Sequence, residues 1–106
     1  MKINTFSKTF IDLENDIIKS QKKNGELEDL TLAQVCVFTI LQEFEDEKPT
    51  GQDKSYRYSL AMKIKGHNNL TVDLSVEDVA FCKERIAKGY GSLIYGQAEK
   101  YLEGEN

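Results

Sequence analysis

The chain of 106 residues has no tryptophan, one proline, one histidine and two cysteines, and each scarcity removes a class of protein. Two cysteines cannot build the framework of several disulfides that stabilises small secreted scaffolds. A zinc site needs several cysteine or histidine ligands at short spacings, whereas Cys36, His67 and Cys82 stand in separate segments. We therefore expect no metal, no cofactor and no disulfide, with both thiols buried in a protein of a reducing compartment.

Long apolar runs and a surplus of basic residues are also missing. No segment approaches the roughly 18 apolar residues of a membrane-spanning helix, and the opening sequence, MKINTFSKTF, lacks the apolar stretch of a secretory signal. The formal net charge is -4, whereas domains that bind a phosphate backbone usually carry a basic face. These absences argue against membrane and nucleic-acid partners and predict a cytoplasmic protein.

The residues that are abundant describe a small globular domain. Hydrophobic residues make up 40% of the chain and charged residues 30%, which is typical of a folded domain. The most apolar segment is TLAQVCVFTILQEF at residues 31–44, which is apolar around most of a helix circumference. Such a helix is normally a buried central element. We expect it to lie in the interior, so that only the outer surfaces of the molecule, and no chemical pocket, remain for function.

Helix-start signals support the central helix and two later ones. In a capping box, each of two residues bonds the backbone N–H of the other through its side chain. The predicted capping boxes are Thr31 with Gln34, Thr50 with Asp53, and Ser75 with Asp78. The predicted helices cover residues 31–44, 50–66, 75–89 and 92–102. Gly66 is placed to end the second of them in a left-handed cap.

The N-terminal segment predicts the β part of the fold. Residues 12–16, DLEND, are typical of a turn, because Asp and Asn side chains bond nearby backbone groups; a calcium loop would also need a glycine at its sharp turn. We predict a short β-hairpin with strands at roughly 3–11 and 16–20, and an amphipathic helix over 7–23 is the competing interpretation. Residues 70–74 alternate like a short strand that pairs with this hairpin.

Together these elements predict a mainly α fold, with about four helices and a small N-terminal β-hairpin. The chain is expected to form a single domain, 1–106, in which 1–30 is a hairpin and loop segment and 31–103 is the helical core. The glycine-rich residues 89–96 follow a helix rather than a strand, so they do not match a phosphate-binding loop. We expect them to form a corner between two helices, with Gly96 permitting close packing.

Two charged segments and several tyrosines are the candidate binding features. The run from Glu43 to Glu47 is acidic at the exit of the central helix, where negative charge opposes the helix dipole. This run therefore predicts an early helix end or a cationic neighbour. Residues 54–65 are basic and aromatic, as a nucleic-acid surface would be locally. Given the overall charge, we expect an ordinary solvated helix face, which can also complement the acidic run. No motif indicates a catalytic residue. The candidate partner-binding residues are Glu43, Glu45, Asp46, Glu47, Tyr56, Arg57, Tyr58, Tyr90 and Tyr95.

Four stretches share their order with one group of viral sequences. They are Phe10-Ile11-Asp12-Leu13 with Ile17, TLxxVCV at 31–37, DEKxxGxxKxxRYxLAxKI at 46–64, and VxLSxEDVAxxKERIxKxYxxLIxGQxxxxL at 72–102. In these stretches the chain resembles a family of small proteins encoded by tailed phages and prophages, typically without an assigned activity. The resemblance covers most of the chain. It implies a phage or prophage origin and action inside a bacterial host cell, and it transfers no catalytic residue.

The expected function is that of a non-enzymatic protein-interaction module, used as a phage assembly factor or adaptor and open to homo-oligomerisation. The alternative is an inhibitor of a host defence protein or nucleic-acid enzyme, whose acidic surface occupies a basic groove. The acidity of the chain is mild and partly balanced by basic residues. The inhibitor therefore ranks second and an enzyme third.

Overall fold

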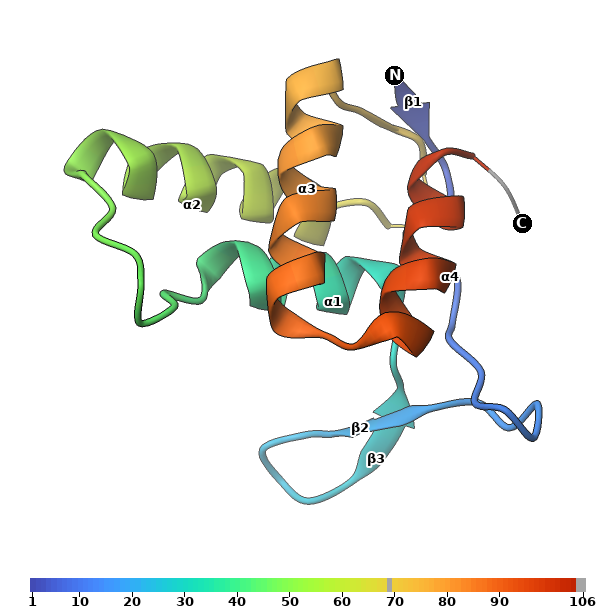
Figure 1. Ribbon diagram of the computed structural model, residues 1–106. Coiled ribbons are helices and arrows are strands. Elements are labelled where there is room, and N and C mark those ends of the chain that lie inside the picture. The colour runs from blue at the N-terminus through green and yellow to red at the C-terminus, as the bar shows by residue number, and fades with distance from the viewer. Residues whose placement is uncertain (69, 105–106) are drawn as a thin grey trace.

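The computed structural model describes residues 1–68 and 70–104, which contain four helices and two small antiparallel sheets (Figure 1). The mainly α fold with a minor β part that the sequence predicts is confirmed. The helices are α1 (Leu32–Leu41), α2 (Gly51–Lys65), α3 (Val76–Gly89) and α4 (Ser92–Leu102). The strands are β1 (Lys2–Ile3), β2 (Lys19–Gln21), β3 (Leu27–Asp29) and β4 (Val72–Asp73).

The helices α1, α2 and α3 each begin at a capping box, as predicted. At α1 the Gln34 N–H donates to Thr31 Oγ1 over 3.4 Å, and the Thr31 N–H donates to Gln34 Oε1 over 3.0 Å. These bonds satisfy N–H groups that a helix start otherwise leaves without a partner. The other two pairs are Thr50 with Asp53 at α2 and Ser75 with Asp78 at α3.

Helix α1 lies at the centre of the helical body. It packs against both α2 and α3, and α4 in turn packs against α3 (Figure 1). Leu32, Val35, Cys36 and Ile40 of α1 are fully shielded from solvent, and their spacing puts them on one side of the helix. This side belongs to a core whose other members include Phe6, Phe10, Leu60, Ile64, Cys82, Ile86, Ala98 and Leu102.

Residues 90–91 connect α3 to α4, so the predicted corner between two helices is confirmed, but two glycines differ from their predicted roles. Gly66 follows α2 with a φ of -81°, so the predicted left-handed cap is wrong; the left-handed residue is Asn68, with a φ of 45°. A Cβ on Gly96 would meet no described atom within 4 Å, so the predicted close packing there is also wrong. Close approach occurs at Gly89, where a Cβ would lie 2.7 Å from Thr39 Cγ2 on α1.

The N-terminal segment contributes strands to two separate sheets. Strand β1 is antiparallel to β4, with Ile3 opposite Val72. The 70–74 strand therefore pairs with the N-terminal segment as expected, but with β1 and not with the hairpin. Strands β2 and β3 form a separate hairpin, with Ser20 opposite Glu28. This hairpin projects from the helical body (Figure 1).

The N-terminal hairpin lies further along the chain than predicted. Its turn contains Gly25, which supplies a left-handed φ of 89°, and it connects β2 to β3. Of the predicted strands at 3–11 and 16–20, only Ile3 and residues 19–20 lie in strands. The bridge between Ile11 and Ile17 closes the predicted turn at 12–16, but it does not extend into a hairpin. The physical reason is burial. Phe6 and Phe10 are buried in the core, so the segment that contains them packs against the helices instead of pairing as a strand.

The competing helix over 7–23 is also wrong. Asp12 Oδ1 accepts the backbone N–H of Glu14 over 2.8 Å and that of Asp16 over 3.0 Å. Asn15 adopts a left-handed φ of 68°, which a continuous right-handed helix does not allow. Local bonds from one aspartate therefore override the helical spacing of the apolar residues.

Candidate functional site

The acidic run at the exit of α1 folds onto a buried arginine. Arg85 on α3 is fully shielded from solvent. Its guanidinium donates to the carboxylate of Glu47 and, through Nε, to the Thr39 carbonyl oxygen over 3.0 Å. A further guanidinium nitrogen donates to the Gln42 carbonyl oxygen. Because Thr39 and Gln42 lie at the C-terminal end of α1, Arg85 caps carbonyls that the helix itself leaves without partners.

Glu47 is the common partner of several cations. Besides Arg85, Lys88 Nζ lies 3.2 Å and Arg57 Nη2 lies 3.6 Å from its carboxylate, and the Phe44 N–H donates to it over 3.1 Å. The hydrogen bond from Arg85, assisted by those from Phe44 and Lys88, lowers the pKa of Glu47 to about 2, although burial acts in the opposite direction. The ionised carboxylate therefore stabilises the fold.

The other acidic candidates surround this network on the surface. Glu43 Oε1 lies 3.6 Å from Lys54 Nζ, and Asp46 Oδ2 lies 3.7 Å from Lys88 Nζ. Glu45 is exposed. The predicted pairing of the acidic run with the basic segment of α2 is confirmed. Exposed pairs of this kind each contribute little to stability, but they neutralise much of the charge that an acidic docking surface would use.

The candidate tyrosine Tyr56 connects α2 to the start of α3. Its hydroxyl donates to Asp78 over 2.6 Å, and its ring meets that of Phe81 edge-on at 5.4 Å. Burial and the bond to Asp78 raise the pKa of Tyr56. Burial alone would raise the pKa of Asp78, but hydrogen bonds from Tyr56 and Ser75 outweigh it and lower that pKa. The hydrogen bond that holds α2 against α3 contributes to both pKa shifts, so they indicate a structural role for Tyr56 and Asp78.

The remaining candidate tyrosines lie at separate places. Tyr58 on α2 is exposed. The Tyr95 hydroxyl donates to Glu99 over 3.1 Å, and this bond raises the pKa of Tyr95. Tyr90 is half-buried, and its ring meets the Phe38 ring edge-on at 6.4 Å. The structure therefore distributes the candidate tyrosines over several elements, and Phe38 connects one of them to the exposed side of α1.

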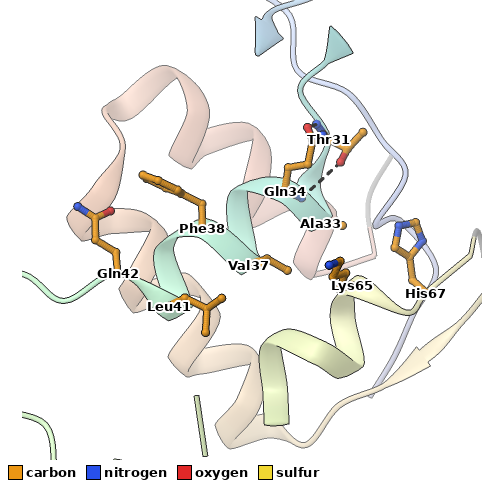
Figure 2. Close-up of a pocket in the computed structure, with 9 residues that line it drawn as sticks. All are labelled: Thr31, Ala33, Gln34, Val37, Phe38, Leu41, Gln42, Lys65 and His67. Carbon is orange, nitrogen blue, oxygen red and sulfur yellow. Dashed lines mark hydrogen bonds between the residues drawn. The ribbon is translucent and has the colours of Figure 1, made fainter. Parts of the chain in front are cut away.

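An apolar groove of about 720 Å³ runs along the exposed side of α1 (Figure 2). Most of its lining comes from α1, and Lys65 and His67, at the end of α2 and just beyond it, form the facing border. We call this feature the α1 groove, and it is lined by Thr31, Ala33, Gln34, Val37, Phe38, Leu41, Gln42, Lys65 and His67.

Helix spacing explains why α1 has this second apolar side. With about 3.6 residues per turn, Phe38 and Leu41 fall on the face opposite Leu32 and Cys36. Phe38 is 57% exposed and Leu41 is 50% exposed, whereas Leu32 and Cys36 are fully shielded. Exposed large apolar side chains that gather in a hollow are typical of a binding site.

The polar groups of the α1 groove lie at its borders. Gln34 completes the helix cap with Thr31 and donates from Nε2 to Glu28 Oε1 over 2.8 Å. Lys65 and His67 are the ionisable residues of the lining, and the His67 ring lies 6.1 Å from the Phe6 ring. This arrangement offers apolar contact in the middle and positive charge at one border, which suits recognition of a chain segment.

The two thiols lie in the core. Cys36 and Cys82 are both free and fully shielded, as predicted. A hydrogen bond with Cys82, together with burial, raises the pKa of the Cys36 thiol well above its ordinary value, so the thiol stays protonated and is a poor nucleophile. Within residues 1–68 and 70–104, no three His, Cys, Asp or Glu side chains are placed to hold a metal ion.

The α1 groove corrects the expectation that the 31–44 segment leaves no pocket. Its inner side is buried as predicted, but Phe38 and Leu41 face outward. The signal was present in the sequence, because a helix that is apolar on all sides needs neighbours on all sides. Helices α2 and α3 pack against α1 and leave one sector open.

Comparisons of the chain with protein-family models, with curated proteins and with solved structures gave no match. In the part of the chain that the structure describes, no helix has the length and apolar character needed to cross a membrane. A functional conclusion therefore depends on the geometry of the α1 groove and its surroundings.

Proposed function

We propose that the protein is a non-enzymatic interaction module that holds an apolar segment of a protein partner in the α1 groove. The observation that supports this function is the joint exposure of Phe38 and Leu41 in a hollow of about 720 Å³. Large apolar side chains in a concave surface are typical anchors for a protein ligand. Grooves beside helices bind amphipathic segments through apolar residues spaced along one face of the ligand.

The groove is fixed before a partner arrives. The Thr31–Gln34 capping box holds the N-terminal end of α1, and the bonds from Arg85 hold its C-terminal end. Val35 and Ile40 anchor its inner side in the core. A preformed site loses less conformational freedom on binding, so more of the apolar contact energy appears as affinity.

In the phage or prophage setting that the sequence resemblance implies, this module acts as an assembly factor or adaptor. An inhibitor that mimics nucleic acid would need a continuous acidic surface. Glu43, Asp46 and Glu47 are instead paired with cations of the same fold. This pairing supports the adaptor over the inhibitor.

A peptide selection tests the proposed function, because it needs no partner of known identity. The wild-type chain is immobilised and challenged with a random library of linear peptides, and the affinity of each enriched peptide is measured by titration calorimetry. We expect the enriched peptides to carry apolar anchors. The variants Phe38→Ser and Leu41→Ser should each weaken their binding by at least about tenfold, because apolar anchors in a hollow dominate such affinities.

The matched control is Leu27→Ser. Leu27 on β3 is 69% exposed and does not line the α1 groove, so this variant should bind the same peptides with wild-type affinity. Enriched peptides that bind the F38S and L41S variants as tightly as the wild type would refute the proposed function. The same selection is run with the immobilised L41S variant as a second bait. If no peptide is enriched more strongly on the wild type than on this variant, the proposed function is refuted as well.

A further inference from the structure

A projecting turn near the N-terminus displays a leucine on a fixed backbone. Leu13 is 90% exposed. The side chain of Asp12 holds the turn by accepting the backbone N–H groups of Glu14 and Asp16. We call residues 12–16 the acidic turn. An apolar side chain held on a rigid, exposed turn loses little conformational freedom when a partner buries it.

The acidic turn is attached to α4 and lies apart from the α1 groove. The Ile11 N–H donates to Gln97 Oε1 over 3.0 Å, and Gln97 Nε2 donates back to the Ile11 carbonyl oxygen over 2.9 Å. None of residues 12–16 lines the α1 groove, and in Figure 1 the turn projects at the edge of the molecule near α4. The turn and the groove therefore consist of different residues, so one copy can offer the turn while a second copy offers the groove.

The charges of the two surfaces are complementary. Asp12 and Glu14 flank Leu13 in the sequence and Asp16 belongs to the same turn, whereas Lys65 borders the α1 groove. Within residues 1–68 and 70–104, none of these four charged side chains forms an ion pair. A leucine flanked by carboxylates matches an apolar groove bordered by a lysine, because opposite charges at the edge of an apolar contact set orientation and speed association.

We propose that the acidic turn of one copy of this chain occupies the α1 groove of a second copy. Leu13 then contacts Phe38 and Leu41, and Glu14 faces Lys65. This inference rests on the proposed function, since it uses the same groove, and it names the chain itself as the occupant. The contact joins two different surfaces, so an open assembly of any length still carries one free turn and one free groove. Such head-to-tail contacts extend into rings or filaments.

Analytical ultracentrifugation of the full chain tests this inference. Between about 10 μM and about 1 mM, the wild-type average mass should rise with concentration, as expected for a contact in the micromolar to millimolar range. Leu13→Ser and Leu41→Ser should each remain monomeric. An equimolar mixture of the two variants should recover species of two chains, because L13S keeps an intact groove and L41S keeps an intact turn. Leu27→Ser should associate like the wild type.

A charge exchange tests the orientation of the contact. Glu14→Lys and Lys65→Glu should each weaken association, by about threefold or more, because each places like charges together at the edge of the contact. The chain that carries both substitutions should associate like the wild type. Folding does not depend on either side chain, since both are exposed.

Two results would overturn the inference: a wild-type chain that stays monomeric at the highest concentration, and an L13S variant that associates like the wild type. Neither result changes the expected outcome of the peptide selection, which tests the groove independently. Failure of self-association alone therefore removes the second copy as occupant and leaves the proposed function standing. The proposed function falls when the selected peptides bind the F38S and L41S variants as tightly as the wild type, or when the selection enriches no peptide more strongly on the wild type than on the L41S bait.

Discussion

The two sides of α1 have similar chemistry and opposite surroundings. Val35, Cys36 and Ile40 are fully shielded, whereas Phe38 and Leu41 are exposed by half or more. The difference lies in the neighbours: α2 and α3 pack against the first side, and the second side lines the α1 groove. Hydrophobicity identifies the surfaces that gain from being covered, and the rest of the fold decides whether the same chain or a partner covers them.

The largest expected effect comes from placing the same charge on each side. Val35→Asp puts a carboxylate into the core and should destabilise the fold by more than about 4 kcal/mol, enough to unfold a domain of ordinary stability. Leu41→Asp puts the carboxylate on the exposed side and should cost at most about 1 kcal/mol. Circular dichroism during urea denaturation measures both. A V35D chain with the wild-type urea midpoint would contradict the assignment of the buried side.

The second effect comes from Arg85, which holds the end of α1 that both sides share. Arg85→Ala leaves the Glu47 carboxylate without its main partner and the α1 carbonyls uncapped, and it should cost about 3–5 kcal/mol in the same denaturation experiment. Lys54→Ala is the control, because its pair with Glu43 is exposed, and it should cost less than about 1 kcal/mol. Similar losses for R85A and K54A would show that the buried network does not anchor α1.

The third effect is a dependence of stability on pH that arises from Glu47. The pKa of this carboxyl is about 2 in the folded chain against an ordinary value of 4.5, so the unfolded chain binds more protons between these values. Stability should therefore fall as the pH is lowered from about 4.5 to about 2, by roughly 3 kcal/mol from this group. Urea midpoints measured across this pH range give the size of the loss.

Two variants isolate the contribution of Glu47 to that acid sensitivity. Glu47→Gln should flatten the dependence, although the variant is less stable at neutral pH because Arg85 loses its charged partner. Glu45→Gln changes an exposed carboxyl of the same loop and should leave the wild-type dependence intact. An E47Q chain that keeps the full loss of stability in acid would assign the effect to other carboxyls.

The smallest expected effect concerns the contact between α3 and the buried side of α1. Gly89→Ala places a Cβ 2.7 Å from Thr39 Cγ2, and the required shift should cost about 1–3 kcal/mol. Gly96→Ala is the matched control inside α4, where a Cβ has open space, and it should stabilise the fold by up to about 1 kcal/mol. Thermal unfolding measures both changes, and equal effects would contradict the close approach at Gly89.

The helices were predictable from the sequence because their signals are local. A capping box such as Thr31 with Gln34 needs only residues three apart, and the apolar spacing that follows it defines the buried side. The N-terminal segment was harder, since its apolar residues fit both a strand and a helix. Asp12 decides the outcome through bonds to its own turn, and Phe6 and Phe10 decide it through distant core contacts.

The candidate site was predictable only in part. The chemistry of the α1 groove is visible in the sequence as Phe38 and Leu41, but their exposure depends on where α2 ends and how α3 crosses α1. The acidic run is conspicuous in the sequence for its charge, and the structure places Glu47 on a buried arginine. Which charges are neutralised within the fold is a property of tertiary packing, and a sequence pattern alone does not contain it.

The measurement that tests the central claim most directly is a titration of the isotope-labelled chain with a peptide from the selection, followed by amide chemical shifts. If the outer side of α1 is the binding surface, the shifts should concentrate in residues 33–42 and 65–67, and the amides that face the core of α3 and α4 should stay unchanged. Shifts that concentrate instead at the acidic loop around Glu45 or at Tyr95 would contradict the account.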